Sequence, residues 1–130
     1  MADTEKVSFN MSVVDLGQVD LLVRQGFYSG RTDFFVAAVR SLLQKHAATV
    51  QQEVARRSMT LGVAAFGRPE LEQAASQGEP LDIRVVGVLT IQDDVSVELA
   101  RAAIRSVSVF GKFLASPEIK ALFLPERSRA

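Results

Sequence analysis

The sequence predicts an α+β protein with two folded parts, a small N-terminal dimerisation module and a C-terminal array of three strand–helix units. Three observations predict this fold. One short alternating segment near the N-terminus is followed by two helical patterns and no nearby second strand. A Gly–apolar–acidic pattern then recurs, with its glycines 25 and 24 residues apart. The chain has 130 residues, 48% of them hydrophobic, which suits one domain or two small ones.

The expected organisation has four segments. Residues 1–48 form the dimerisation module, and residues 49–57 form a helical linker because no Gly or Pro interrupts them. Residues 58–124 hold the three repeated units, and residues 125–130, PERSRA, form a charged tail.

The composition excludes several classes of site. The chain has no cysteine, which excludes disulfides, thiol nucleophiles and thiolate metal sites and suits a reducing cytosol. Its apolar runs are far shorter than the roughly 20 residues that span a bilayer, and its start, MADTEK, lacks the pattern of a secretory signal. We therefore expect a cytoplasmic protein with no membrane partner. Fifteen basic and fifteen acidic residues balance, so the composition gives no sign of a polyanionic partner.

Residues 6–12, KVSFNMS, have the alternation of a half-buried strand. Val7, Phe9 and Met11 fall on the apolar face, and the polar face carries Lys6, Ser8, Asn10 and Ser12. A lone strand leaves its backbone N–H and C=O groups unpaired along both edges. The simplest partner is the same strand of a second copy.

Two helices are expected after this strand. Asp15 has the residue type of an N-cap for the first helix, and Gly26 ends that helix in a left-handed conformation. Thr32 is expected to cap the second helix, with Asp33 at its positive end. No breaker follows before Arg57, so this helix is expected to run on as a stalk. The strand and the packed part of the helices come to roughly 40 residues, too few for a core without dimerisation.

The order strand, helix, SGRTDFF turn and AAVRSLL helix resembles the MetJ/Arc/CopG ribbon-helix-helix DNA-binding family, over about residues 5–46. The resemblance implies an intertwined homodimer whose antiparallel ribbon enters the major groove of double-stranded DNA. By position, Ser8, Asn10 and Ser12 would contact the bases. The implied phosphate contacts are Lys6, Arg31, Thr32 and Asp33. The implied dimer core consists of Val7, Phe9, Met11, Phe35, Val39 and Leu42.

This chain departs from that family in its charge. Ribbons of the family usually carry an Arg, Lys or Gln among the base-facing residues, where this chain has two Ser and one Asn. Residues 1–57 hold seven basic and six acidic residues. We therefore expect one dimer to bind DNA weakly unless several dimers cooperate.

The C-terminal half repeats one pattern three times, starting at Leu61, Val86 and Phe110. The expected strands are 58–66, 83–91 and 106–114, and the expected helices are 69–76, 96–104 and 117–123. Apolar strands separated by helical crossovers predict a parallel, solenoid-like sheet. Three valine-rich segments in an ordinary small α/β domain are the alternative.

No motif in the chain supports catalysis or a cofactor. His46 is the sole imidazole, and the pair Asp93–Asp94 sits in a turn where Asp commonly caps a helix. The chain contains no phosphate-binding glycine loop. Arg56 and Arg57 form a small basic cluster that suits solvent or phosphate contacts. We expect a protein that is not an enzyme and has no metal or cofactor.

The functional hypothesis is a DNA-binding transcriptional regulator, most simply a repressor, that acts as a homodimer or a higher oligomer. Two alternatives stay open. One is the antitoxin of a toxin–antitoxin pair, which would add a toxin partner. The other is a scaffold whose N-terminal module only dimerises and whose repeats oligomerise.

Overall fold

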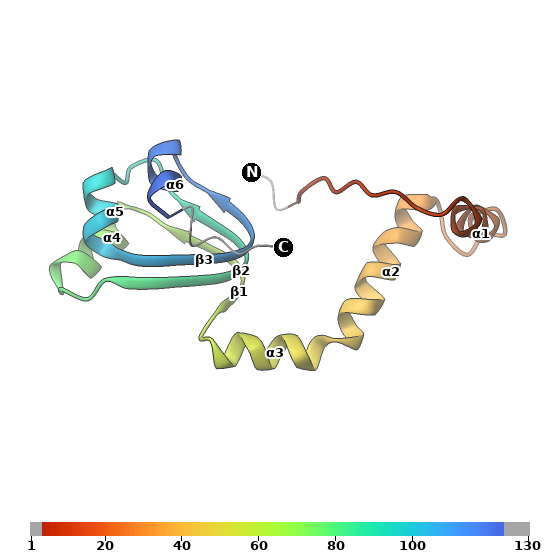
Figure 1. Ribbon diagram of the computed structural model, residues 1–130, viewed down its shortest axis with the longest axis horizontal. Helices are drawn as coiled ribbons and strands as arrows, with labels where there is room; N and C mark the ends of the chain where they lie inside the picture. The colour runs from red at the N-terminus through yellow and green to blue at the C-terminus, as the bar shows by residue number, and fades with distance from the viewer. Residues whose placement is uncertain (1–3, 124–130) are drawn as a thin grey trace. The chain divides into compact units, whose positions relative to one another are not determined.

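The computed structural model describes residues 4–123, so the tail expected at 125–130 lies outside the described residues. The chain forms two compact units, residues 1–50 and 51–130. The described elements, labelled in Figure 1, follow in the order α1 (Val13–Arg24), α2 (Arg31–Lys45), α3 (Ala47–Arg56), β1 (Thr60–Phe66), α4 (Arg68–Ser76), β2 (Leu81–Ile91), α5 (Val97–Ala103), β3 (Ile104–Leu114) and α6 (Pro117–Phe123). Helix α3 begins in the first unit and ends in the second. No helix within residues 4–123 is long and apolar enough to cross a membrane.

Residues 4–12 form no strand in the single chain, in contrast to the strand expected at 6–12. A strand is held by hydrogen bonds to a neighbouring strand, and the three strands described in residues 4–123 all lie in the second unit. The side chains of Val7 and Phe9 are 76% and 63% exposed. The single chain therefore leaves this segment without the partner that its alternation requires.

The ends of the first two helices differ from the expected ones. Ser12, not Asp15, is the N-cap of α1, and its Oγ accepts a hydrogen bond from the Asp15 N–H at 3.5 Å. Asp15 instead lies in the first turn, where a carboxylate is favoured by the helix dipole. Gly30, not Thr32, is the N-cap of α2. Its backbone is extended, and the helix starts there without a side-chain cap.

The expected stalk is broken at His46. Helix α2 ends at Lys45, and α3 begins at Ala47. The His46 N–H donates to the carbonyl oxygens of both Leu42, at 3.3 Å, and Leu43, at 3.1 Å. A bond shared with the third and fourth preceding carbonyls tightens the last turn and ends the regular helix. Because no Gly or Pro marks this point, the pattern could not reveal it.

The first unit has almost no interior of its own. Among the described residues 4–50, only Val19 is fully buried. Large apolar side chains on α1, α2 and their connection are 46–82% exposed, namely Val13, Val14, Leu21, Phe27, Val36, Val39, Leu42 and Leu43. So much exposed apolar surface on about 45 residues indicates that one copy of this unit does not complete a hydrophobic core.

The second unit is built on a three-stranded parallel sheet in the order β1-β2-β3, with one helix after each strand. Inward-facing side chains of the strands, such as Val85, Leu89 and Phe113, pack with side chains of α4, α5 and α6 in one hydrophobic core. Within residues 51–123, no helix covers the opposite face of the sheet, and Leu61 and Phe110 on it are 53% and 43% exposed. The parallel sheet and its three following helices confirm that part of the prediction, with ends shifted by at most two residues.

The three glycines of the repeated pattern lie side by side in the sheet, because Gly62 pairs with Gly87 and Gly87 pairs with Gly111. Gly87 has a φ of +136°, and a Cβ placed on it would lie 2.0 Å from the Gly62 carbonyl oxygen. The close approach of neighbouring backbones therefore requires glycine at position 87.

Candidate nucleic-acid interface

The polar face expected on residues 6–12 is open to solvent. Lys6, Ser8, Asn10 and Ser12 are all exposed. The Oγ of Ser12 accepts a hydrogen bond as the cap of α1, so its hydroxyl proton is left to donate. Asn10 offers an amide with both donors and an acceptor. The segment can therefore present hydrogen-bonding groups to a ligand along one side.

The apolar face of the segment begins a row of aromatic rings. Phe9 packs edge to face on Phe35 of α2, with ring centroids 5.9 Å apart and planes at 72°. The row continues from Phe35 to Phe34, and from Phe34 to Tyr28, with centroids 5.9 Å and 5.0 Å apart. The structure thus brings together Phe9 and Phe35 of the expected dimer core. Tyr28 and Phe34 were not among the predicted site residues, although the aromatic cluster FYSGRTDFF was a signal for them.

The rest of the expected dimer core is not buried in the single chain. Met11 and Phe35 are half-buried, whereas Val39 and Leu42 are each 57% exposed. Val39 and Leu42 stand three positions apart on α2 and therefore lie on the same side of that helix. An apolar stripe of this kind is ready to pack against another helix.

The start of α2 has backbone N–H groups suited to an anion, but its charged side chains, Arg31 and Asp33, already have hydrogen-bond partners. The first hydrogen bond within the helix runs from the Phe34 N–H to the Gly30 carbonyl, so the N–H groups of Arg31, Thr32 and Asp33 precede the ladder. The Asp33 carboxylate accepts from the N–H and the hydroxyl of Ser29, at 3.0 Å and 3.2 Å. This orientation turns the carboxylate back toward the connection between the helices.

Arg31, expected at a phosphate, is held by Asp20 of α1. Its Nε and Nη2 donate to the two carboxylate oxygens at 2.8 Å and 2.9 Å. This hydrogen bonding lowers the pKa of Asp20 below its usual value. Both side chains are about half exposed, so the pair ties α1 to α2 only weakly. A phosphate would have to share Arg31 with Asp20.

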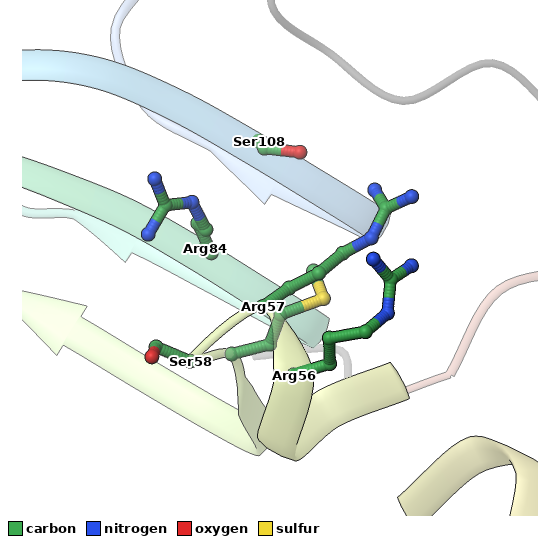
Figure 2. A pocket seen from close by; sticks show the side chains of 6 residues that line it. Arg56, Arg57, Ser58, Arg84 and Ser108 are labelled. Carbon is green, nitrogen blue, oxygen red and sulfur yellow. The ribbon is translucent and has the colours of Figure 1, made fainter. Parts of the chain in front are cut away.

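A second polar site lies within residues 51–130, on the uncovered face of the sheet. We call it the arginine pocket; its volume is about 390 Å³. Arg56, Arg57 and Ser58 line it from the end of α3, together with Arg84 of β2 and Ser108 of β3, and Figure 2 shows the Arg84 guanidinium directed away from those of Arg56 and Arg57. Arg84 and Ser108 are register partners. Only the adjacent pair Arg56 and Arg57 was recognisable in the sequence, because no local pattern links this pair to Arg84 on β2 or Ser108 on β3.

The charges at the arginine pocket are only partly compensated. Arg56 Nη2 lies 2.8 Å from Glu53 Oε1, and Arg57 Nε lies 3.4 Å from the same oxygen. The hydrogen bond from Arg56 is the main reason that the pKa of Glu53 lies below its usual value.

Across residues 4–123, no group of three His, Cys, Asp or Glu side chains could hold a metal ion.

A sequence model of the ribbon-helix-helix transcriptional regulator family matches residues 2–120. The match covers nearly the whole chain, so it extends the resemblance from about residues 5–46 through the parallel sheet. No curated protein and no solved structure matches this chain.

Proposed function

The chain belongs to the ribbon-helix-helix transcriptional regulator family, and from that premise we propose that it is a homodimeric repressor that binds a specific DNA sequence. The observation that carries this proposal is the family match over residues 2–120, combined with an exposed N-terminal segment of alternating polarity that has no strand partner. The role is regulatory and not catalytic.

The proposed dimer forms when residues 6–12 of two copies pair as antiparallel strands. Each strand then satisfies the backbone groups of the other, and Val7, Phe9 and Met11 turn toward the helices. The aromatic contact between Phe9 and Phe35 supports this orientation. The exposed apolar side chains of α1 and α2 supply the remaining surface of the shared core.

Base recognition is assigned to the opposite face of this ribbon. The major groove admits a two-stranded ribbon, and alternation sends every second side chain toward the base edges. Asn10 is suited to a bidentate contact with adenine, while Ser8 and Ser12 accept several bases. We place the sequence preference mainly on Asn10.

The phosphate contacts are assigned to the start of α2 and to Lys6. The N–H groups of Thr32 and Asp33 point away from the helix ladder and fit a phosphate oxygen. Arg31 and the Asp33 carboxylate are engaged with Asp20 and Ser29. Few cations are therefore free per subunit, and the affinity of one dimer is expected to be modest.

The second unit is proposed to join dimers into tetramers or larger arrays. In the order β1-β2-β3, β1 and β3 are edge strands, and each has one edge that pairs with no other strand described in residues 4–123. The in-register glycines support descent of the three strand–helix units from one repeated unit, with boundaries at 58–124. Linked dimers compensate for a weak ribbon through multivalency.

Selection of bound duplexes from a random-sequence pool tests the proposal directly. A regulator enriches one motif with two related half-sites, because a two-fold dimer contacts DNA twice. The enriched duplex should then shift in a gel, with an affinity that falls as salt rises. A pool that stays random at low salt would contradict sequence-specific binding and favour the oligomerising scaffold. Co-purification of a toxic protein that releases the chain from DNA would favour the antitoxin.

A further inference from the structure

We propose that the arginine pocket binds a phosphoryl group. The pocket lies wholly within residues 51–130, so its geometry does not depend on the N-terminal unit. The inference goes beyond the proposed function and does not rest on it. A volume of about 390 Å³ leaves room for a phosphoryl group and part of the molecule that carries it.

The electrostatic balance of the pocket favours an anion. Arg56 and Arg57 share the single carboxylate of Glu53, and Arg84 has no ion pair within residues 4–123. The three arginines and the Glu53 carboxylate together leave two positive charges that no carboxylate balances. Asp82 stands two residues before Arg84 on β2 but forms no ion pair with it. Its carboxylate instead accepts a hydrogen bond from the Ser106 hydroxyl at 2.7 Å.

No carboxylate lines the pocket, whose walls are formed by Arg56, Arg57, Ser58, Met59, Arg84 and Ser108. The C-terminal end of α3 carries a partial negative charge. Two of its last carbonyl oxygens, those of Ala55 and Val54, accept from the Ser58 and Met59 N–H groups at 3.2 Å and 2.8 Å, which reduces that charge. The charged and hydroxyl groups along the pocket are therefore all hydrogen-bond donors.

Ser58 lines the pocket in a backbone conformation that is unusual for a residue with a Cβ. Its φ of +52° lies in the left-handed region, and it is the one non-glycine residue there within residues 4–123. It holds the position after the end of α3 where glycine is usual, because glycine has no Cβ to strain. Serine accepts that strain but adds a hydroxyl to the wall of the pocket. We assign that hydroxyl to the bound anion.

A phosphoryl group matches these donors in charge and shape. A phosphate monoester carries about −1.5 to −2 charges near pH 7, which balances the two uncompensated arginines. Guanidinium groups donate two parallel hydrogen bonds to phosphate oxygens, and serine hydroxyls donate one each. The phosphoryl group belongs either to a small phosphorylated ligand or to the backbone of bound DNA, and the experiment below separates these sources.

The first test titrates the full-length chain with inorganic phosphate at low salt, using calorimetry. Arg57→Gln and Arg84→Gln should each weaken phosphate binding about tenfold, because each removes a charge-assisted contact. Arg101→Gln on α5 is the matched control, since it removes an equal charge from an exposed arginine that does not line the pocket. Arg84→Lys should restore part of the affinity. No phosphate binding by the parent chain, or equal losses in Arg101→Gln, would overturn the proposal.

Ser58→Gly separates binding from stability. Relief of the left-handed strain should raise the melting temperature, whereas loss of the hydroxyl should weaken phosphate binding several-fold. A purely structural serine would show only the first change. Equal phosphate affinity in Ser58→Gly and the parent would therefore remove the hydroxyl from the site.

Titration of the same variants with a DNA duplex identifies the source of the phosphoryl group. If it belongs to DNA, Arg57→Gln and Arg84→Gln lower duplex affinity and reduce the salt dependence by about one counterion each. If it belongs to a small ligand, both variants keep duplex affinity but lose phosphate. Failure of the proposed base recognition is distinct, because it abolishes motif selection by the ribbon without changing phosphate binding to the pocket.

Discussion

Asn10 is the one amide side chain of residues 6–12, and that makes it the sharpest probe of DNA recognition. Two hydroxyl residues flank it on the same face, and both are tolerant of different bases. Its exposure in the single chain means that truncation removes no core contact. An effect of its removal on DNA binding is therefore readily separated from an effect on folding.

Asn10→Ala should weaken binding to the selected duplex by about 1–3 kcal/mol, the value of one bidentate base contact. The dimer should remain intact, because Asn10 is exposed and lies outside the row of aromatic contacts. Fluorescence anisotropy with the selected duplex measures the change, and a scrambled duplex is the control, on which the variant should bind like the parent. Equal affinity for the selected duplex would remove Asn10 from base recognition.

Gly87 shows how one residue limits the sheet. Gly87→Ala places a Cβ 2.0 Å from the Gly62 carbonyl oxygen, whereas a Cβ on Gly62 meets nothing within 4 Å. Both glycines have positive φ, so Gly62→Ala is the matched control for backbone strain of about 1–3 kcal/mol. Urea unfolding should show a larger loss for Gly87→Ala than for Gly62→Ala. Equal losses would mean that the sheet adjusts to the extra atom.

At the scale of elements, residues 4–12 and helices α1 and α2 form a group that is incomplete in one chain. Val19 of α1 is the single fully buried residue in the described part of this unit, whereas other apolar side chains of both helices, such as Leu21 and Val39, are more than half exposed. The side chain of Phe9 touches Phe35 yet stays 63% exposed. Its contribution to stability must therefore come mainly from surface that a second copy would cover.

Phe9→Ala should destabilise the dimer by about 3–5 kcal/mol, as expected for truncation of a buried aromatic side chain. The loss should appear as dissociation at protein concentrations where the parent is dimeric, measured by analytical ultracentrifugation. Phe27→Ala is a useful comparison, because Phe27 is similarly exposed, at 67%, but lies in the connection after α1 and outside the proposed ribbon. A parent-like dimer in Phe9→Ala would place this ring outside the interface.

The pair Asp20–Arg31 predicts a small acid dependence of the contact between α1 and α2. Because the folded pKa of Asp20 is lowered, the stabilisation is complete above its unfolded pKa, about 3.9, and is lost as pH falls through the folded value. Asp20→Asn should therefore be less stable than the parent near pH 7, with a difference that shrinks toward about pH 2. Thermal melts across this pH range measure it. Arg31→Gln should reproduce the change, and a gap that stays constant with pH would contradict the pairing.

At the scale of the whole molecule, the unit that we propose binds DNA is joined in the chain to a second unit with a buried core of its own. The family match across residues 2–120 indicates that the two units form one inherited arrangement. Within residues 4–123 the sheet has two edge strands, which suits the proposed assembly, and assembly multiplies weak contacts. In the proposed function, the number of copies that act together matters as well as single side chains.

Cooperative DNA binding should follow from this arrangement. A duplex with two adjacent copies of the selected motif should bind far more tightly than a duplex with one, by about 10²-fold or more. Quantitative gel shifts measure the ratio, and a chain truncated after residue 57 tests whether the second unit provides the link. Independent occupation of the two motifs by the full chain would contradict assembly on DNA.

Much of the fold was predictable because its signals are local. The apolar strands of the sheet and the prolines Pro69 and Pro117 at helix starts are each written in a few neighbouring residues. The alternation at 6–12, in contrast, predicted a strand that the single chain does not form. The parallel sheet followed from strand spacing, since connections of this length are typically crossovers. The exact caps Ser12 and Gly30, and the break at His46, depend on backbone geometry that several residue types permit.

The sequence by itself determined which segments form helices and strands in residues 58–123, and it predicts that the N-terminal alternating segment pairs with a second copy. Only the tertiary structure decided that Arg31 is held by Asp20, and that Arg84 and Ser108 line one pocket with the end of α3. The physical reason is range. Periodicity and turn chemistry act between neighbours in the chain, whereas ion pairs and pockets depend on the register of strands about 25 residues apart, which one-dimensional patterns do not encode.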